Sequence, residues 1–503
     1  MRVFALIPPT LLCSAIAMPA VADVTPEDVW NDTLATVKLF GQTLTADLER
    51  DGETLIARNI EFRSAEEDGF ETVTTTEQLD LVNLGDGSVK MVFVSPVTSQ
   101  SSFPSYGTLT EDEALAEMTS NILIKGDIIV SGDPDDLTYT VDGIDFEFLS
   151  EVSADDDLAL DQTTEMAMTD VSGAWTSKRD ASNIKGQFKL DADGYNFQMY
   201  QPGAEGPRTQ INATMTGVAS EGDYEGSTDT ADMGSALEAL SARFAQSFEA
   251  GTFDAKFADG DRPSSTNATG TIGHTWIDMS TLDGNVSYET SSSDLAAKLS
   301  GPAVPVEDAQ FFVSKMTSNI TLPMTGSDTP QPFGLGMSFE GLGVSSALWA
   351  MFDPLGELNQ EPATVTVQLS GSALVSEDLT PSNPTAFAEN DMPTLETLNL
   401  ETLLISFAGA KIDATGAFKA NEGGMATMGF PDLIGSIDAT LTNVTSLIDT
   451  LTRIGLAPPE FGGMAQMMLG MLARPGSEPG VLVSHIERTA DGQILANGLP
   501  LPF

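Results

Sequence analysis

The sequence predicts a mainly β protein with a few helices, an α+β chain whose strands form an extended, curved antiparallel meander. Alternating apolar and polar residues recur over short segments along most of the chain, as in half-buried strands. Gly- and Asp-containing turns such as Asp51-Gly52 and Asp86-Gly87 separate these segments. Hydrophobic residues make up 41% of the chain, which is too many for a disordered protein.

Residues 1–22 are typical of a secretory signal peptide. Arg2 gives a positive start, an apolar run follows, and Ala20-Val21-Ala22 has the small-x-small pattern that precedes cleavage. We therefore expect a periplasmic protein that begins at Asp23 and keeps no transmembrane anchor, since no other apolar run approaches the length of a bilayer span. Cys13 is the only cysteine, so the mature chain would contain no disulfide and no thiol nucleophile.

The region 23–375 is predicted to be one extended, antiparallel β-rich region with two helices. Thr25, Pro26 and the acids that follow indicate a helix near 26–40. Alternating segments follow, and a second helix is predicted near 233–249 from an apolar stripe of helical spacing. That stripe consists of Met233, Leu237, Leu240, Phe244 and Phe248.

Pro, Ser and Asn are frequent in residues 376–394, which we interpret as a loop or linker. Residues 395–503 are predicted to hold strands and two helices, near 443–455 and 463–473. The last part has the order of a β–helix–helix–β unit, which we expect to be continuous with the preceding sheet.

Charge and composition limit the possible partners. The chain has 74 acidic and 22 basic residues, a net charge of −52, so nucleic acid and anionic membrane surfaces should be repelled. The acidity fits either a surface for cations or a basic partner, or solubility in a salty medium.

No catalytic motif is present, and we predict a non-enzymatic protein without a cofactor or a metal. His274 and His485 are the only histidines, and no Gly-x-Ser-x-Gly occurs. Asp191-Ala192-Asp193-Gly194 lacks the ligands of a calcium loop and is interpreted as a β-turn, whereas Asp133-Pro134-Asp135-Asp136 could hold calcium weakly. Carboxylate pairs are abundant, so a carboxylate-dependent hydrolase stays an alternative.

A methionine-rich segment is the most suggestive apolar feature. It could form an adaptable surface for a lipid tail or a partner helix, or it could pack on the preceding helix. The candidate apolar surface comprises Leu447, Leu451, Met464, Met467, Met468 and Met471.

Several segments together resemble a family of exported alphaproteobacterial proteins called domain of unknown function 2125. They are 23–30 (DVTPEDVW), 346–354 (SALWAMFDP), 361–364 (EPAT), 404–410 (LISFAGA), 462–475 (from Gly462 to Pro475) and 495–498 (LANG). The resemblance implies export and transfers no catalytic residue. The order of the C-terminal elements is also similar to that of AsmA-like envelope proteins, some of which conduct lipid in long β-grooves; this is an analogy of layout only.

These observations favour an exported, non-catalytic envelope protein that binds lipid or another apolar ligand in a β-groove. The alternative is a structural or protein-binding periplasmic module, with a cation-binding version of it. The partners would then be lipid or an envelope protein.

Overall fold

The computed structural model describes residues 23–39, 41–64, 71–104, 115–154, 161–203, 206–229, 239–259, 262–282, 284–376, 379, 393–421 and 432–501. The predicted signal peptide and most of the predicted linker 376–394 lie outside these residues. Both assignments therefore stay predictions.

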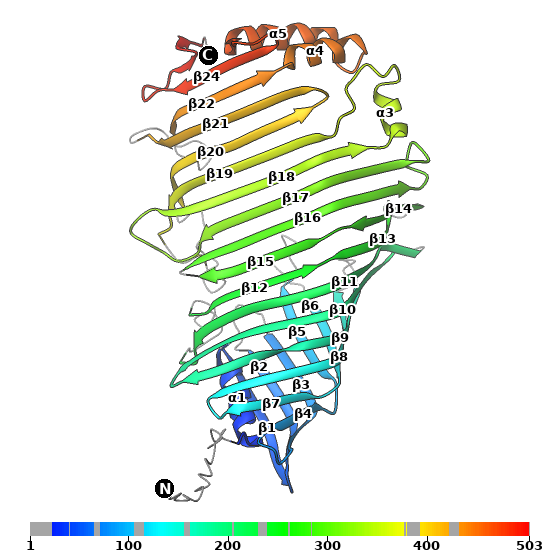
Figure 1. Ribbon diagram of the computed structural model, residues 1–503, viewed down its shortest axis with the longest axis vertical. Coiled ribbons are helices and arrows are strands. Elements are labelled where there is room, and N and C mark those ends of the chain that lie inside the picture. The colour runs from blue at the N-terminus through cyan, green and yellow to red at the C-terminus, as the bar shows by residue number, and fades with distance from the viewer. Residues whose placement is uncertain are drawn as a thin grey trace, which may run out of the picture.

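One antiparallel sheet and four helices account for the described elements, so the prediction of a mainly β chain is confirmed (Figure 1). The helices are α1 (Pro26–Leu39), α3 (Ser346–Phe352), α4 (Val444–Arg453) and α5 (Pro459–Leu472). The N-terminal strands are β1 (Gln42–Asp51), β2 (Thr54–Ser64), β3 (Glu71–Asn83), β4 (Val89–Phe93), β5 (Val97–Pro104), β6 (Leu115–Lys125), β7 (Ile128–Asp133), β8 (Asp136–Ala154), β9 (Gln162–Asp180), β10 (Asn183–Gly203) and β11 (Gly206–Ser227).

The central strands are β12 (Ser241–Phe248), β13 (Ala250–Asp259), β14 (Arg262–Ile272), β15 (Thr275–Leu282), β16 (Asn285–Ser300), β17 (Ala309–Pro323), β18 (Gln331–Val344) and β19 (Ala363–Leu374). The C-terminal strands are β20 (Thr394–Phe407), β21 (Ala410–Ala420), β22 (Leu433–Thr442), β23 (Arg474–Pro475), β24 (Val481–Arg488), β25 (Ile494–Ala496) and β26 (Leu499–Pro500). Strand β19 pairs directly with β20, so the sheet continues across the predicted linker.

The sheet is rolled at its N-terminal end and opens towards its C-terminal end. Helix α1 contacts β1, β2 and β3 and also the distant strand β10, which requires the sheet to curl around the helix. Figure 1 shows β1–β5 behind β8–β11 at this narrow end, whereas β15–β22 spread into a broad sheet. Helices α4 and α5 lie across the opposite end, beside β22 and β24.

Local sequence explains where α1 begins. The Thr25 hydroxyl accepts a hydrogen bond from the Asp28 N–H at 3.3 Å, and an Asp28 carboxylate oxygen accepts one from the Thr25 N–H at 2.9 Å. This reciprocal pair is a capping box that satisfies donors at the helix start. Val29 and Trp30 are buried against the rolled sheet, so the predicted helix near 26–40 is confirmed.

The helix predicted near 233–249 is wrong where the structure describes it, because residues 241–248 form strand β12. Leu240, Phe244 and Phe248 are four residues apart, and a spacing of four places residues on one face of a strand as well as on one face of a helix. Pairing with β11 and β15 decided between the two conformations. Residues 230–238, which include Met233 and Leu237, lie outside the described part of the chain.

A continuous line of irregular positions, which we call the crease, crosses the sheet from β2 to β18. At this line a strand either ends, and the next strand begins, or contains one extra residue that has no partner in the neighbouring strand. Several of the extra residues have positive φ. These are Asn59, Gly143, Asp170, Gly217, Asp294 and Gly341. On β9, the apolar side chains before Asp170 are at even positions, Met166 and Met168. After Asp170 they are at odd positions, Val171 and Trp175. An extra residue of this kind bends a strand and keeps its apolar side chains on one face.

Candidate functional site

The side of the sheet that faces α1 is its inner face. Trp30 of α1 belongs to one buried cluster with Leu81, Tyr139 and Val171, which come from three different strands. Residues that pair directly across antiparallel strands point to the same face. The inner face can therefore be followed from these residues through the whole sheet.

Following the pairs from Tyr139 gives a continuous first apolar row. Tyr139 pairs with Trp175, their rings stack at 4.9 Å, and Trp175 pairs with Phe188. The row then continues through Gly222, Phe244, Met279, Tyr288, Ile320, Leu335, Leu369, Leu400, Gly416, Ile437, Ile486 and Ala496. It thus spans the sheet from β8 to β25 without a charged residue.

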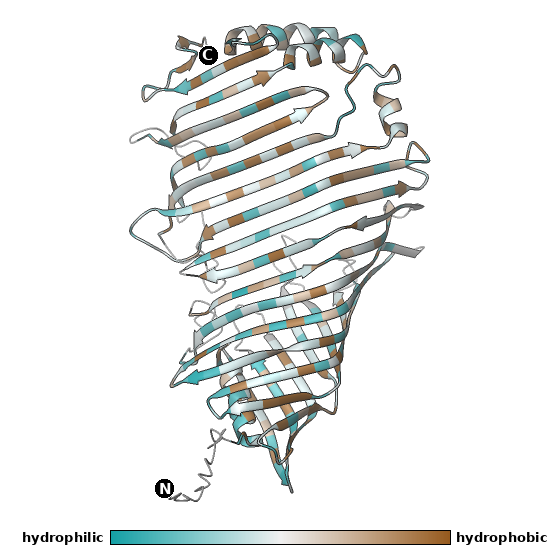
Figure 2. Cartoon of the chain, in the orientation of Figure 1, coloured by the Kyte–Doolittle hydropathy of each residue, from teal (hydrophilic) through white to brown (hydrophobic). Residues whose placement is uncertain are grey.

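A second apolar row runs on the other side of the crease, from β6 to β18. It consists of Ile122, Phe148, Met166, Phe197, Ala213, Phe253, Gly270, Ala297, Phe311 and Val344. Because the crease shifts the alternation by one residue, both rows lie on the inner face. Figure 2 shows the hydrophobic and hydrophilic bands that this alternation produces along the strands.

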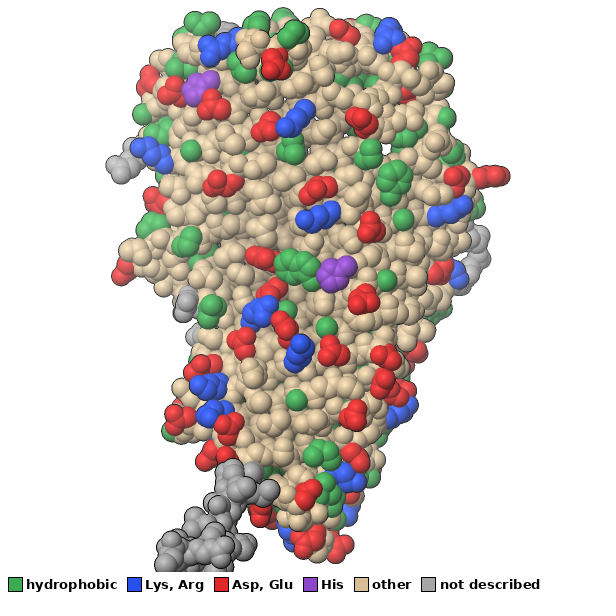
Figure 3. Space-filling view, in the orientation of Figure 1, with side chains coloured by type: hydrophobic (Ala, Val, Ile, Leu, Met, Phe, Trp, Pro, Cys, Tyr) green, Lys and Arg blue, Asp and Glu red, His purple; other side chains and the backbone are tan. Residues whose placement is uncertain are grey.

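The inner face carries no charge over the open part of the sheet. On β12 and β15–β19, every paired inner position is apolar or is Gly, Ser, Thr, Gln or Tyr. One residue further along each strand, the outer face has a polar row with Glu221, Asp278 and Glu289. Although the chain has a net charge of −52, the charged side chains of these paired strands lie on the outer face of the sheet. Figure 3 shows acidic, basic and histidine side chains spread over one face.

The inner face of the open part is not filled like a core. Ile320 is 36% exposed and Met337 is 51% exposed, although both lie in the middle of the sheet. Met279 and Leu322 are exposed to a similar degree. We call the inner face of β12 and β15–β20 the apolar trough.

The second apolar row ends in a pocket of about 430 Å³. Strand ends, α3, the loop after α3 and α4 enclose it, and Trp349 stacks on Phe407 with ring centroids 6.2 Å apart. The lining residues are Phe311, Phe312, Val313, Leu342, Gly343, Val344, Trp349, Phe352, Leu358, Glu361, Ala363, Phe407, Leu451 and Leu456. Glu361 is the one charged residue of this lining, so the pocket is chemically an extension of the trough.

Buried Asp353 fixes the loop that forms one wall of this pocket. Its two carboxylate oxygens accept hydrogen bonds from the Glu357 N–H at 3.0 Å and the Leu358 N–H at 2.7 Å. The ion pair between Glu357 and Arg453 then ties the loop to the end of α4. The loop is therefore fixed both by Asp353 and by its ion pair with α4.

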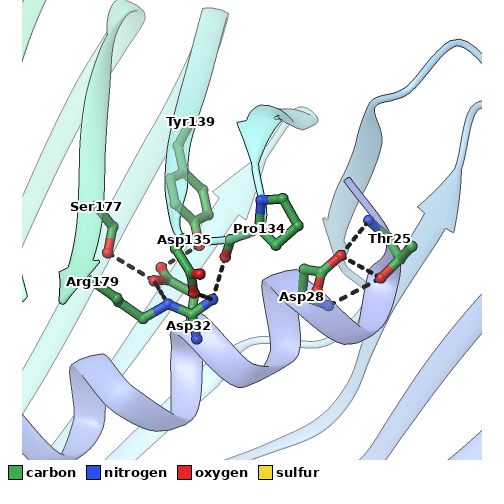
Figure 4. Close-up of polar contacts among 8 residues, drawn as sticks. All are labelled: Thr25, Asp28, Asp32, Pro134, Asp135, Tyr139, Ser177 and Arg179. Atoms are coloured by element: carbon green, nitrogen blue, oxygen red, sulfur yellow. Dashed lines mark hydrogen bonds and ion pairs between the residues drawn. The ribbon is translucent and has the colours of Figure 1, made fainter. Parts of the chain in front are cut away.

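The narrow end of the sheet is closed by α1 and a buried polar cluster (Figure 4). The hydroxyls of Tyr139 and Ser177 donate hydrogen bonds to the two carboxylate oxygens of Asp32, at 2.7 and 2.8 Å. The Arg179 guanidinium lies 3.4 Å from the same carboxylate and donates a hydrogen bond to the Pro134 carbonyl. These contacts join α1 to β8 and β9 across the interior.

Burial controls the ionisation of this cluster. Loss of solvent raises the pKa of Asp32, and the contacts from Tyr139, Ser177 and Arg179 act in the opposite direction. Burial and the neighbouring Asp32 carboxylate raise the pKa of Tyr139. A buried acid with a raised pKa can mark a reactive site, but here every partner joins α1 to the sheet, so the cluster serves to fasten the helix.

The predicted apolar surface divides into two parts in the structure. Leu447 and Leu451 of α4 are half-buried, and Leu451 lines the pocket. The four methionines of α5 are instead exposed to solvent. The fold brings α4 to the pocket and leaves the methionines outside it.

The acidic segments do not converge. Asp135 and Asp136 pair with the neighbouring Arg179 and Lys178 on β9, and Asp191 and Asp193 lie inside strand β10 near the crease, so the β-turn predicted there is wrong. The exposed His485 ring contacts Asp438 at 2.7 Å on the outer face. Within the described ranges, no group of three His, Cys, Asp or Glu residues could hold a metal ion.

The two apolar rows and the pocket could not be named from the sequence, because their members lie up to hundreds of residues apart. The available signal was the change of alternation within single strands, as at Asp170. No protein-family model, no curated protein and no solved structure matches the chain. Among the described residues, no helix has the length and apolar character needed to cross a bilayer.

Proposed function

We propose that this protein is an exported, non-catalytic envelope protein that holds the acyl chains of a lipid in the apolar trough and its terminal pocket. One observation carries the proposal: the inner face of β12 and β15–β19 is continuous, apolar, uncharged and partly exposed. Exposed apolar patches of this extent on a protein commonly mark a binding surface.

The dimensions of the trough suit an extended hydrocarbon chain. Six strand-to-strand steps separate Phe244 on β12 from Leu400 on β20. At about 4.8 Å per step this is roughly 29 Å, close to the thickness of the hydrocarbon core of a bilayer. An acyl chain lying across the strands would contact the first apolar row along its whole length.

The chemistry of the trough also favours an apolar ligand over a polar one. At the described inner positions of β12 and β15–β19, the polar side chains are those of Ser, Thr, Gln and Tyr, and none of these positions has a charged group to bind a phosphate or a sugar acid. A headgroup would therefore remain in solvent while the acyl chains lie on the sheet. The resemblance to exported envelope families supports the same reading, and the export itself rests on the predicted signal peptide.

The proposal is tested with a dansyl-labelled fatty acid and with native mass spectrometry. The double variant Ile320→Glu/Met337→Glu places two charges in the trough at exposed positions, and we expect the affinity for the fatty acid to fall by about tenfold or more, because a buried carboxylate against hydrocarbon is costly. The control Ser287→Glu/Gln368→Glu adds the same charge to the outer face of the two neighbouring strands, β16 and β19, and should bind normally.

Two results would overturn the proposal. The first is purified protein that never carries or takes up lipid, with unchanged fluorescence of the labelled fatty acid. The second is equal loss of binding in the trough variant and the outer-face control.

A further inference from the structure

Helix α5 presents its larger apolar side chains to solvent. The side that packs on the protein has four residues at helical spacing, the small Gly462 and Ala465 followed by Leu469 and Leu472. The opposite side carries Phe461, Met464, Met467, Met468 and Met471, which are between 41% and 61% exposed. We call these five residues the methionine face.

The close packing of α5 on α4 explains how this orientation is fixed. A Cβ atom at Gly462 would lie 2.6 Å from the Thr452 hydroxyl oxygen, so the helices meet at this glycine. Gln466 donates a hydrogen bond to Asp449 across the same contact. The helix cannot turn its methionines inwards without losing both contacts.

The charge of this region differs from that of the rest of the chain. Residues 444–475, which span α4, α5 and β23, contain two acids and two bases and are neutral overall. At the average charge density of this protein, a segment of that length would carry about three net negative charges. The exposed apolar face thus lies in a part of the chain with few charged residues, so an uncharged, apolar partner can cover it without removing many charged groups from water.

We propose that the methionine face docks on the surface of a lipid bilayer, with its side chains among the acyl chains and α5 parallel to the membrane. Unbranched methionine side chains adapt to a disordered hydrocarbon layer, and a helix that is too short to span a bilayer can still lie in its interface. The position of α5 at the end of the sheet, visible in Figure 1 and as a group of hydrophobic side chains along the upper edge in Figure 3, leaves this approach open.

The position of α4 connects this docking surface to the terminal pocket. Leu451 and Leu456 line the pocket, and α4 packs directly on α5. A bilayer under the methionine face would therefore lie one helix away from the pocket. The docking proposal does not depend on occupancy of the trough, so each proposal can fail alone.

The experiment uses a single fluorescent label and vesicles of uncharged phosphatidylcholine. Cys13 is the only cysteine, so Cys13→Ser/Met467→Cys carries one site for an environment-sensitive nitrobenzoxadiazole label. We expect its emission to shift to shorter wavelength and to increase on addition of vesicles, at both low and high salt. The same label at Ser287→Cys on the outer face of β16 should not respond.

A loss-of-function variant completes the test. Met464→Gln/Met468→Gln/Met471→Gln changes exposed positions only, so its thermal unfolding should match that of the parent chain, while partitioning to vesicles falls by roughly tenfold or more. The trough variant Ile320→Glu/Met337→Glu should dock normally and lose only the fatty acid.

Three outcomes would overturn the docking proposal. They are a label at Met467→Cys that does not respond to vesicles, a response that depends on protein concentration in the absence of vesicles, and unchanged partitioning of the triple variant. The second outcome would assign the methionine face to another copy of the chain.

Discussion

The rolled N-terminal part and the open C-terminal part of the sheet use the same alternation and differ in what covers the inner face. In the rolled part, α1 and the facing strands bury Leu81, Val130 and Leu137 almost completely. In the open part, Ile320, Leu322 and Met337 occupy equivalent inner positions and stay exposed. An apolar sheet face therefore becomes a buried core where the chain supplies a second layer, and stays exposed to solvent where it does not.

The largest expected effect separates these two roles directly. Leu81→Ala removes a fully buried side chain from the rolled part and should lower the free energy of unfolding by about 2–5 kcal/mol. Leu322→Ala removes the same atoms from the trough, where the side chain is 40% exposed, and should cost less than about 1 kcal/mol. Urea denaturation of both variants measures the contrast, and equal losses would mean that the open face is packed after all.

A medium effect is expected at the crease, which both parts share. Gly217 has φ +61°, a left-handed conformation that costs a residue with a Cβ atom about 1–2 kcal/mol, so Gly217→Ala should destabilise the protein by that amount. Gly334→Ala on β18 is the control, because this glycine has an ordinary φ and room for a Cβ atom. An equal loss of stability in Gly334→Ala would contradict the conclusion that the positive φ at the crease causes the effect.

The smallest effect concerns the fastening of α1. The folded-state pKa of Asp32 lies above the usual value of 3.8, so the folded protein binds this proton more tightly than the unfolded chain does. Its contribution to stability is therefore present at low pH and is lost as the pH rises through the folded-state pKa. Because Asn does not titrate, the stability of Asp32→Asn relative to the parent chain should increase as the pH rises from about 3.8 towards neutrality.

Parallel denaturation curves at several pH values test this trend. A difference between the two proteins that stays constant with pH, or that changes in the opposite direction, would contradict the raised pKa. The trough should be indifferent to the same substitution, since Asp32 lies at the closed end.

Local patterns predicted the elements better than they predicted the surface that the elements build. The capping residues before α1 and the alternation of the strands identified most elements, because those signals lie within a few residues of each other. The strand at 241–248 was assigned to a helix because Leu240, Phe244 and Phe248 fit both periods. A β-groove was expected, but the residues that line the trough could not be predicted, because neighbours such as Ile320 and Leu335 become adjacent only through strand pairing.

The orientation of α5 is a second feature that local sequence patterns could not predict. The sequence placed Met464, Met467, Met468 and Met471 on a short helix but left open whether they pack or face solvent. The contact between Gly462 and Thr452 fixes the orientation of α5 on α4, so that the methionines face solvent. A glycine at a helix contact carries that information only when the partner helix is known.

The crease also determines how such a protein can change in length. Deletion of one residue at Asp170 or Gly217 would turn half a strand over and expose its apolar side chains on the charged face, so single-residue changes there should be strongly selected against. Duplication of a whole hairpin keeps the alternation and every neighbouring pair intact. Each duplicated hairpin would extend the trough by roughly 10 Å, which gives this architecture a simple route to longer or shorter forms.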